Sequence, residues 1–113
     1  MDTLQAGLRH ILADRHSPEA AAFYQAVLKM LHKRLAHQAA TRWRGLLQDA
    51  DQEEILGEVL FQLMQGALTR FRGTTMAELM AFVRVIADRT TWRLVDRRFR
   101  ERDAVAGMLD GTL

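Results

Sequence analysis

A row of arginines near the C-terminus alternates with two aromatic side chains, and this combination has a definite chemistry. The row comprises Arg89, Arg93, Arg97 and Arg100, and the aromatic residues are Trp92 and Phe99. Guanidinium groups bind phosphates and flat rings stack on unpaired bases, so the pattern is typical of a surface for single-stranded nucleic acid. A second interpretation stays open: the two rings pack on a neighbouring helix and the arginines are merely solvated.

The arginine row continues the face of a helix that begins as a hydrophobic stripe. The stripe consists of Leu79, Phe82, Val83, Ile86 and Thr90. A buried stripe cannot turn into a row of arginines that still faces the core, because unpaired buried charge costs several kcal/mol. We therefore expect the C-terminal half of this helix to project past the bundle or to line a groove.

An acidic segment precedes this basic one. Residues 48–69 contain five acidic side chains and no basic one, whereas residues 70–102 have a net charge of +5. At about 100° per residue, one side of the acidic helix is apolar and is expected to face the core. That side contains Leu56, Val59, Leu60, Leu63, Met64, Ala67 and Phe71, with Ile55 and Leu68 on its flanks.

The opposite side of the acidic helix combines charge with one large aromatic ring. It contains Asp51, Glu54, Glu58, Gln65 and Phe61. An exposed ring on a polar face favours a protein-docking surface, although Phe61 could instead cover a neighbouring helix. The opposite charges of the two segments suggest that two surfaces meet different partners.

The composition excludes several classes of protein. The 113 residues fit one domain, with 49% hydrophobic and 27% charged residues, and a net charge of only +2. The absence of cysteine excludes a disulfide framework, a thiolate metal site and a cysteine nucleophile. The four histidines share no helical spacing, and no residues pair a nucleophile with a base or form a phosphate-binding glycine loop. We expect no metal, no cofactor and no enzymatic activity.

No apolar run approaches the ~18 residues that span a bilayer, and the N-terminus lacks the apolar segment of a signal peptide. The sequence therefore predicts a soluble cytoplasmic protein with no membrane association.

The local signals predict an all-α fold, a compact bundle of about four helices in a single domain spanning residues 1–113. Expected helices cover residues 4–13, 18–40, 51–70 and 76–102. Ser17 and Thr75 have the positions of N-caps, Asp49 or Asp51 is expected to cap the third helix, and Gly73 is the expected stop after it. Residues 103–113 are expected to form a flexible tail.

Four motifs in order resemble region 2 of the sigma-70 family, most closely its extracytoplasmic-function group. They read DADQEEILGEV at 49–59, FRG at 71–73, L-x-x-F-V-x-x-I-A at 79–87 and DRR-x-R at 96–100. The resemblance covers about residues 20–102. It implies a transcription initiation domain whose partners are core RNA polymerase, through the clamp coiled coil of the largest subunit, and promoter DNA of the −10 type.

The resemblance assigns roles to particular residues. The acidic helix docks on the clamp, so the expected polymerase-binding set is Asp51, Glu54, Glu58, Phe61 and Gln65. The following loop captures a flipped base and the last helix holds the opened strand. The expected DNA-binding set is Phe71, Arg72, Thr74, Thr75, Arg89, Trp92, Arg93, Arg97 and Arg100.

The chain departs from the family pattern at three positions. Gly57 replaces a glutamine, Phe82 a tryptophan and Arg89 an asparagine, and the given chain lacks the region 4 domain that reads the −35 element. The chain is then either an excised domain or a stand-alone protein. These departures leave an alternative open: a sigma mimic that binds an anti-sigma factor or another protein without melting DNA. A purely structural bundle is the third class.

Overall fold

The computed structural model describes the backbone of residues 3–111 and the side chains of residues 4–108. The elements in chain order are α1 (Thr3–Ala13), α2 (Pro18–Ala40), α3 (Asp49–Met64), the short 3-10 helix η1 (Ala67–Arg70) and α4 (Met76–Gly111). The part of the chain that the structure describes contains no β-strand. The all-α bundle of four main helices predicted from the sequence is confirmed.

The start of α2 follows its sequence signal. Ser17 is the N-cap, and its hydroxyl accepts a hydrogen bond of 3.1 Å from the backbone N–H of Ala20. Pro18 occupies the first turn, where its missing N–H costs nothing because that group would be unpaired in any residue. The predicted range 18–40 is confirmed.

The acidic helix is shorter than expected. α3 begins at Asp49 with Gln48 as N-cap, and the Asp51 carboxylate accepts a hydrogen bond of 3.0 Å from the Gln48 N–H. Neither acid is itself the cap. The helix ends at Met64, not near Arg70, because Gly66 has the left-handed backbone conformation (φ 115°) that ends a helix. The chain then continues as η1.

The last helix is longer than expected. Its start has the N-cap bond of the predicted capping box: the Thr75 hydroxyl accepts from the Glu78 N–H at 3.1 Å, and the same hydroxyl donates to the Glu78 carboxylate at 2.9 Å. The helix continues to Gly111, so the predicted end near Arg102 is wrong. Residues 103–111 of the expected tail are helical, and residues 112–113 lie outside the described part.

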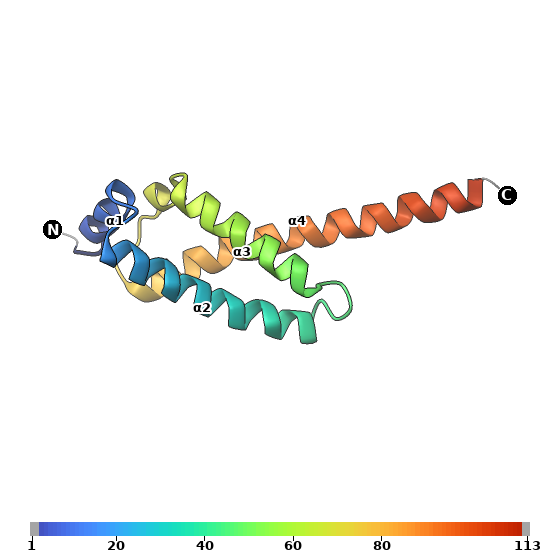
Figure 1. Ribbon diagram of the computed structural model, residues 1–113, viewed down its shortest axis with the longest axis horizontal. Helices are drawn as coiled ribbons and strands as arrows, with labels where there is room; N and C mark the ends of the chain where they lie inside the picture. Colours follow the sequence, from blue (N-terminus) through green and yellow to red (C-terminus); the bar gives the residue numbers. More distant parts are fainter. Residues whose placement is uncertain (1–2, 112–113) are drawn as a thin grey trace.

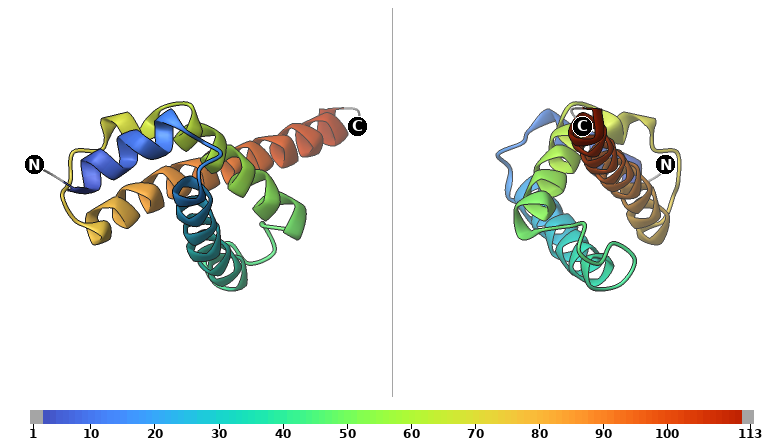
Figure 2. Two further views of the ribbon diagram at one scale, coloured as in Figure 1. Left: turned by 60° about the vertical axis from the view of Figure 1, so that its left-hand side comes forward. Right: turned by 90° about the vertical axis from the view of Figure 1, so that its right-hand side faces the viewer.

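Helix α4 crosses the whole molecule. The bundle of α1, α2 and α3 packs along its N-terminal two-thirds, and its C-terminal end extends beyond them, which gives overall dimensions of 66 × 24 × 24 Å (Figure 1). Viewed along the length of the molecule, α2 and α3 lie on one side of α4 (Figure 2). The arginines of the row are exposed although neighbouring residues of α4 are buried, and Arg93 and Arg97 line a groove beside α3, so the row does not face the core.

The core lies between α2, α3 and α4. Its fully covered side chains include Leu31, Leu35, Ile55, Val59, Leu63, Leu68, Leu79, Val83 and Val95. Ile55 and Leu68 were expected on the flanks of the apolar stripe and are buried, whereas Met64 was expected in the core and is exposed. The early end of α3 explains Leu68, because the helical angle no longer applies after Gly66. No helix among the described residues is both long and apolar enough to cross a bilayer.

Candidate nucleic-acid interface

A hollow on one side of α4 surrounds the exposed ring of Trp92. The hollow has a volume of about 660 Å³ and is lined by Gln62, Arg70, Arg89, Trp92, Arg93 and Asp96. The Trp92 side chain is 56% exposed, which is unusual for so large an apolar group. We call this surface the Trp92 hollow.

Three elements position the residues of the Trp92 hollow. Arg89 and Arg93 are one helical turn apart on α4, and both line the hollow together with Trp92. Arg70 ends η1, and Gln62 comes from the last turn of α3. The Gln62 amide donates hydrogen bonds to Thr90 Oγ1 at 3.1 Å and to Glu58 at 3.3 Å, which joins α3 to α4.

The positive charges of the Trp92 hollow are not neutralised internally. Among the described residues, no carboxylate lies within 4.0 Å of the guanidinium nitrogens of Arg70, Arg89 or Arg93. The only acid of the lining, Asp96, already pairs with Arg100 at 3.1 Å. Three uncompensated guanidinium groups around an exposed indole can hold phosphates while the ring stacks on a base.

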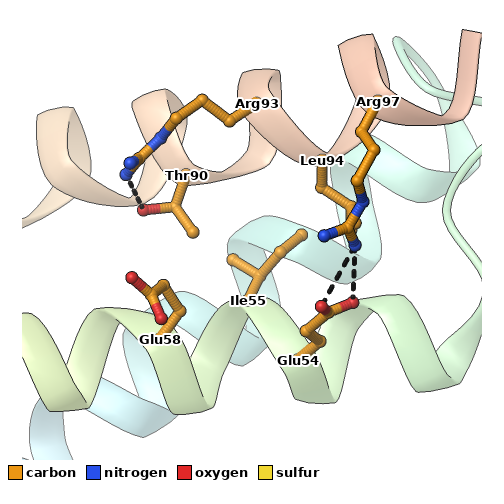
Figure 3. A pocket seen from close by; sticks show the side chains of 7 residues that line it. All are labelled: Glu54, Ile55, Glu58, Thr90, Arg93, Leu94 and Arg97. Carbon is orange, nitrogen blue, oxygen red and sulfur yellow. Dashed lines mark hydrogen bonds and ion pairs between the residues drawn. The ribbon is translucent and has the colours of Figure 1, made fainter. Parts of the chain in front are cut away.

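The arginine row also borders a second surface, between α3 and α4. This surface, the paired groove, has a volume of about 330 Å³ and is lined by Glu54, Ile55, Glu58, Thr90, Arg93, Leu94 and Arg97 (Figure 3). Arg97 Nη2 donates to both oxygens of Glu54, at 3.1 and 3.4 Å. Acidic and basic residues expected on separate surfaces therefore lie face to face, and part of each charge is used within the chain.

The sequence suggested that Asp51 belongs to an exposed docking face, but Asp51 is buried and does not line the paired groove. Its side chain is buried and accepts a 2.7 Å hydrogen bond from Arg98, which also pairs with Glu101. Burial alone would raise the pKa of Asp51, but hydrogen bonds from Gln48 N–H and Arg98 bring that pKa below its usual value. Asp51 therefore joins α3 to α4.

The rest of the acidic face remains open. Phe61 is 57% exposed, so it does not cover a neighbouring helix, and Glu58 and Gln65 are also exposed. Glu54 is about half exposed beside Arg97. The described geometry thus leaves Glu58, Phe61 and Gln65 available to a partner.

The loop expected to capture a base is only partly accessible. Phe71 is buried and its ring lies 5.5 Å from that of Phe82, so the predicted DNA contact by Phe71 does not fit this structure. Gln5 of α1 donates 3.1 Å hydrogen bonds to the carbonyls of Phe71 and Gly73. No sequence pattern predicted these two hydrogen bonds between distant segments.

Steric crowding explains why residue 73 is glycine, and Gly73 is not the helix stop that the sequence had suggested. A Cβ atom there would collide with the ring of Phe71. Arg72 is exposed and donates to the carbonyls of Thr69 and Phe71. Thr74 and Thr75 are exposed, but the Thr75 hydroxyl already serves the start of α4.

Sequence reasoning missed Arg70 and Gln62 of the hollow, and it missed Trp43. Trp43 follows α2, and its ring centroid lies 5.1 Å from that of Trp92. Trp92 therefore contacts a ring in the connection that follows the second helix. A further unexpected contact is the bidentate pair of Arg34 with Asp88, at 3.0 and 2.8 Å, which joins α2 to α4.

In the described part of the chain, no group of three or more His, Asp and Glu side chains could hold a metal ion. Comparisons with protein-family models, with curated proteins and with solved structures found no match.

Proposed function

We propose that this chain is a sigma-factor-like transcription initiation domain that binds single-stranded promoter DNA of the −10 type at the Trp92 hollow. The observation that carries the proposal is the exposed Trp92 indole among Arg70, Arg89 and Arg93, none of which has a carboxylate partner. Unpaired guanidinium groups release counterions when they bind phosphates, and exposed rings replace the stacking that an opened base loses.

The second half of the proposal concerns core RNA polymerase. Glu58, Phe61 and Gln65 form an exposed polar surface with one central ring on α3, on the helix that resembles the polymerase-docking helix of the sigma-70 family. An aromatic anchor with a charged rim is a common arrangement at protein interfaces. The proposal places the protein in the cytoplasm with the polymerase.

A second function is favoured by the paired groove. Because Glu54 pairs with Arg97 and Asp51 with Arg98, two of the acids expected at the polymerase are engaged within the chain. A sigma mimic that binds an anti-sigma factor or another protein, and never melts DNA, needs no free arginine row. Binding of single-stranded DNA separates the two candidates.

The first experiment titrates a labelled single-stranded oligonucleotide of −10 type into the protein at several salt concentrations, with the duplex as a comparison. Three phosphate contacts predict a slope of about −2 in a plot of log K against log salt. Arg93→Ala should reduce the slope by about 0.7, whereas Lys29→Ala, which removes one charge from α2, should not change it. A binding constant independent of salt, or equal effects of the two variants, would contradict the DNA-binding role.

The second experiment measures retention of core polymerase by the immobilised protein. Glu58→Lys should reduce retention, because it reverses a charge beside Phe61 on the exposed face of α3. Glu53→Lys makes the same charge change at another exposed position of α3 and is the matched control. Equal retention by wild type and Glu58→Lys would show that the docking surface is misassigned.

A further inference from the structure

The chain has two tryptophans, and the fold brings them together. Trp43 lies in the connection between α2 and α3, Trp92 lies on α4, and their ring planes meet at 39° with centroids 5.1 Å apart. A tryptophan pair inside a core would be covered, but Trp92 is mostly exposed and Trp43 is half-buried. The pair therefore forms part of the surface, next to the Trp92 hollow.

The backbone of the connection holds Trp43 in place. The Trp43 N–H donates a 2.7 Å hydrogen bond to the carbonyl of Gln38, and the Trp43 carbonyl accepts bonds from Leu46 and Leu47. Gly45 has a left-handed backbone (φ 77°), which permits this tight turn. The ring is thus positioned before any ligand binds, which reduces the ordering cost of binding.

Positive charge accompanies Trp43 as it accompanies Trp92. The guanidinium carbon of Arg42 lies 4.8 Å from the Trp43 ring centroid. Arg42 and Arg44 are both exposed, and among the described residues neither has a carboxylate within 4.0 Å. The same chemistry as in the Trp92 hollow, an indole with unpaired guanidinium groups, therefore occurs twice at adjoining positions.

A small cavity joins the two rings. It has a volume of about 70 Å³ and is lined by Gln38, Arg42, Trp43, Asp88, Thr91 and Trp92. The Oε1 atom of Gln38 is buried and has no hydrogen-bond partner in the described part of the chain, whereas Asp88 is held by Arg34. The cavity thus places groups of α2, of the α2–α3 connection and of α4 next to one another beside the two rings.

We infer that the binding surface for single-stranded nucleic acid continues from the Trp92 hollow across the tryptophan pair to the α2–α3 connection, where a second base stacks against Trp43 and Arg42 and Arg44 bind its phosphates. The inference rests on the proposed DNA binding at the Trp92 hollow. The inference adds a binding site on the α2–α3 connection, which lies outside both the arginine row and the acidic helix.

The test compares binding of a short single-stranded oligonucleotide with that of one several nucleotides longer. Trp43→Leu removes the ring while keeping a large apolar side chain, and it should weaken binding of the longer oligonucleotide by about tenfold. Arg42→Gln should reduce the salt slope for the longer oligonucleotide by about 0.7. Val105→Ala, which removes an exposed apolar side chain from the distal part of α4, is the control and should leave both properties unchanged.

Fluorescence gives a second measurement that does not depend on the stability of Trp43→Leu. In a Trp92→Phe variant, Trp43 is the remaining indole, and stacking of a base on it should quench its emission on titration with the longer oligonucleotide. Quenching together with the loss of affinity in Trp43→Leu or Arg42→Gln supports the inference. Wild-type binding that is unchanged in both variants, with no quenching of Trp43, overturns the inference and leaves the proposed function intact. Absence of any binding by wild type overturns both.

Discussion

The arginines on the two sides of the arginine-rich helix differ in whether a carboxylate of the same chain pairs with them. In the paired groove, Arg97 faces Glu54, and nearby Arg98 is held by the buried Asp51. In the Trp92 hollow, Arg70 and Arg89 have no carboxylate within 4.0 Å among the described residues. An arginine count therefore does not measure the capacity to bind phosphate, because each pairing within the fold removes part of that capacity.

The largest expected difference is in the affinity for single-stranded DNA, between a double variant in the Trp92 hollow and a double variant of arginines that are paired within the chain. Arg89→Ala with Arg93→Ala should weaken binding of single-stranded DNA about 100-fold, since each lost phosphate contact costs about tenfold. Arg97→Ala with Arg100→Ala removes the same charge from residues paired with Glu54 and Asp96, and should cost less than about threefold. Anisotropy titrations at one fixed salt concentration measure both. Equal losses would mean that the two sides do not differ.

The second prediction concerns the free energy of unfolding, to which the pair of Asp51 with Arg98 contributes. Asp51→Asn should lower the free energy of unfolding at pH 7 by about 2 kcal/mol, because it removes the charge from a buried acceptor of two hydrogen bonds. Folding lowers the pKa of Asp51, so its contribution is present above about pH 4 and is lost as the pH falls through the folded-state pKa. The difference between wild type and variant should therefore shrink in acid.

Urea denaturation at pH 7 and near pH 2 measures this difference. Asp49→Asn changes an exposed acid in the same helical turn and should alter stability by less than about 0.5 kcal/mol. A difference between wild type and Asp51→Asn that is the same at both pH values would contradict the assigned linkage.

The third prediction uses Gly57, an exposed glycine within α3, the helix that forms one wall of the paired groove. A Cβ atom at Gly57 would meet no heavy atom within 4 Å, so Gly57→Ala should raise the free energy of unfolding by about 1 kcal/mol through helix propensity. Binding of single-stranded DNA should not change, since Gly57 does not line the Trp92 hollow. Gly73→Ala should instead destabilise the fold, because its Cβ would collide with Phe71. Thermal denaturation distinguishes the two; equal shifts would contradict the packing described for Gly73.

The smallest effect is expected from releasing a paired arginine. Glu54→Gln frees Arg97 and should raise the affinity for single-stranded DNA by two- to threefold at low salt, with little change in stability because the pair is half exposed. Glu53→Gln makes the same charge change at an exposed residue without a partner among the described residues. If both variants raise the affinity equally, the effect is one of overall charge, and the pairing does not restrain Arg97.

The fold could be predicted from the sequence where local chemistry decides it. Ser17 before Pro18, and Thr75 three residues before Glu78, fix helix starts through hydrogen bonds within a single turn. The end of α3 was misplaced because η1 continues the apolar pattern after Gly66, so periodicity alone could not reveal the break. Phe71 was expected both in the core stripe and in the DNA-binding loop, and its burial satisfies only the first expectation.

The candidate site depended on contacts between distant segments. Charge alone predicted that the arginines would avoid the core. It could not predict which of them would pair with a carboxylate. The pairing of Arg97 with Glu54 is set by how α3 packs on α4, and the pairing of Trp43 with Trp92 by the turn after α2. No helical periodicity relates these residues, so the sequence could not place them together.

The tryptophan pair also gives the molecule an optical property. Both indoles lie at one junction, the contact between the α2–α3 connection and α4, so the tryptophan fluorescence of the folded chain originates at that junction. Rings at this separation couple their electronic transitions, and the coupling gives a circular-dichroism signal that disappears when the rings separate. If the connection leaves α4 before the helices melt, that signal will be lost while the helical signal persists. The junction can therefore be followed independently of the bundle without an added label.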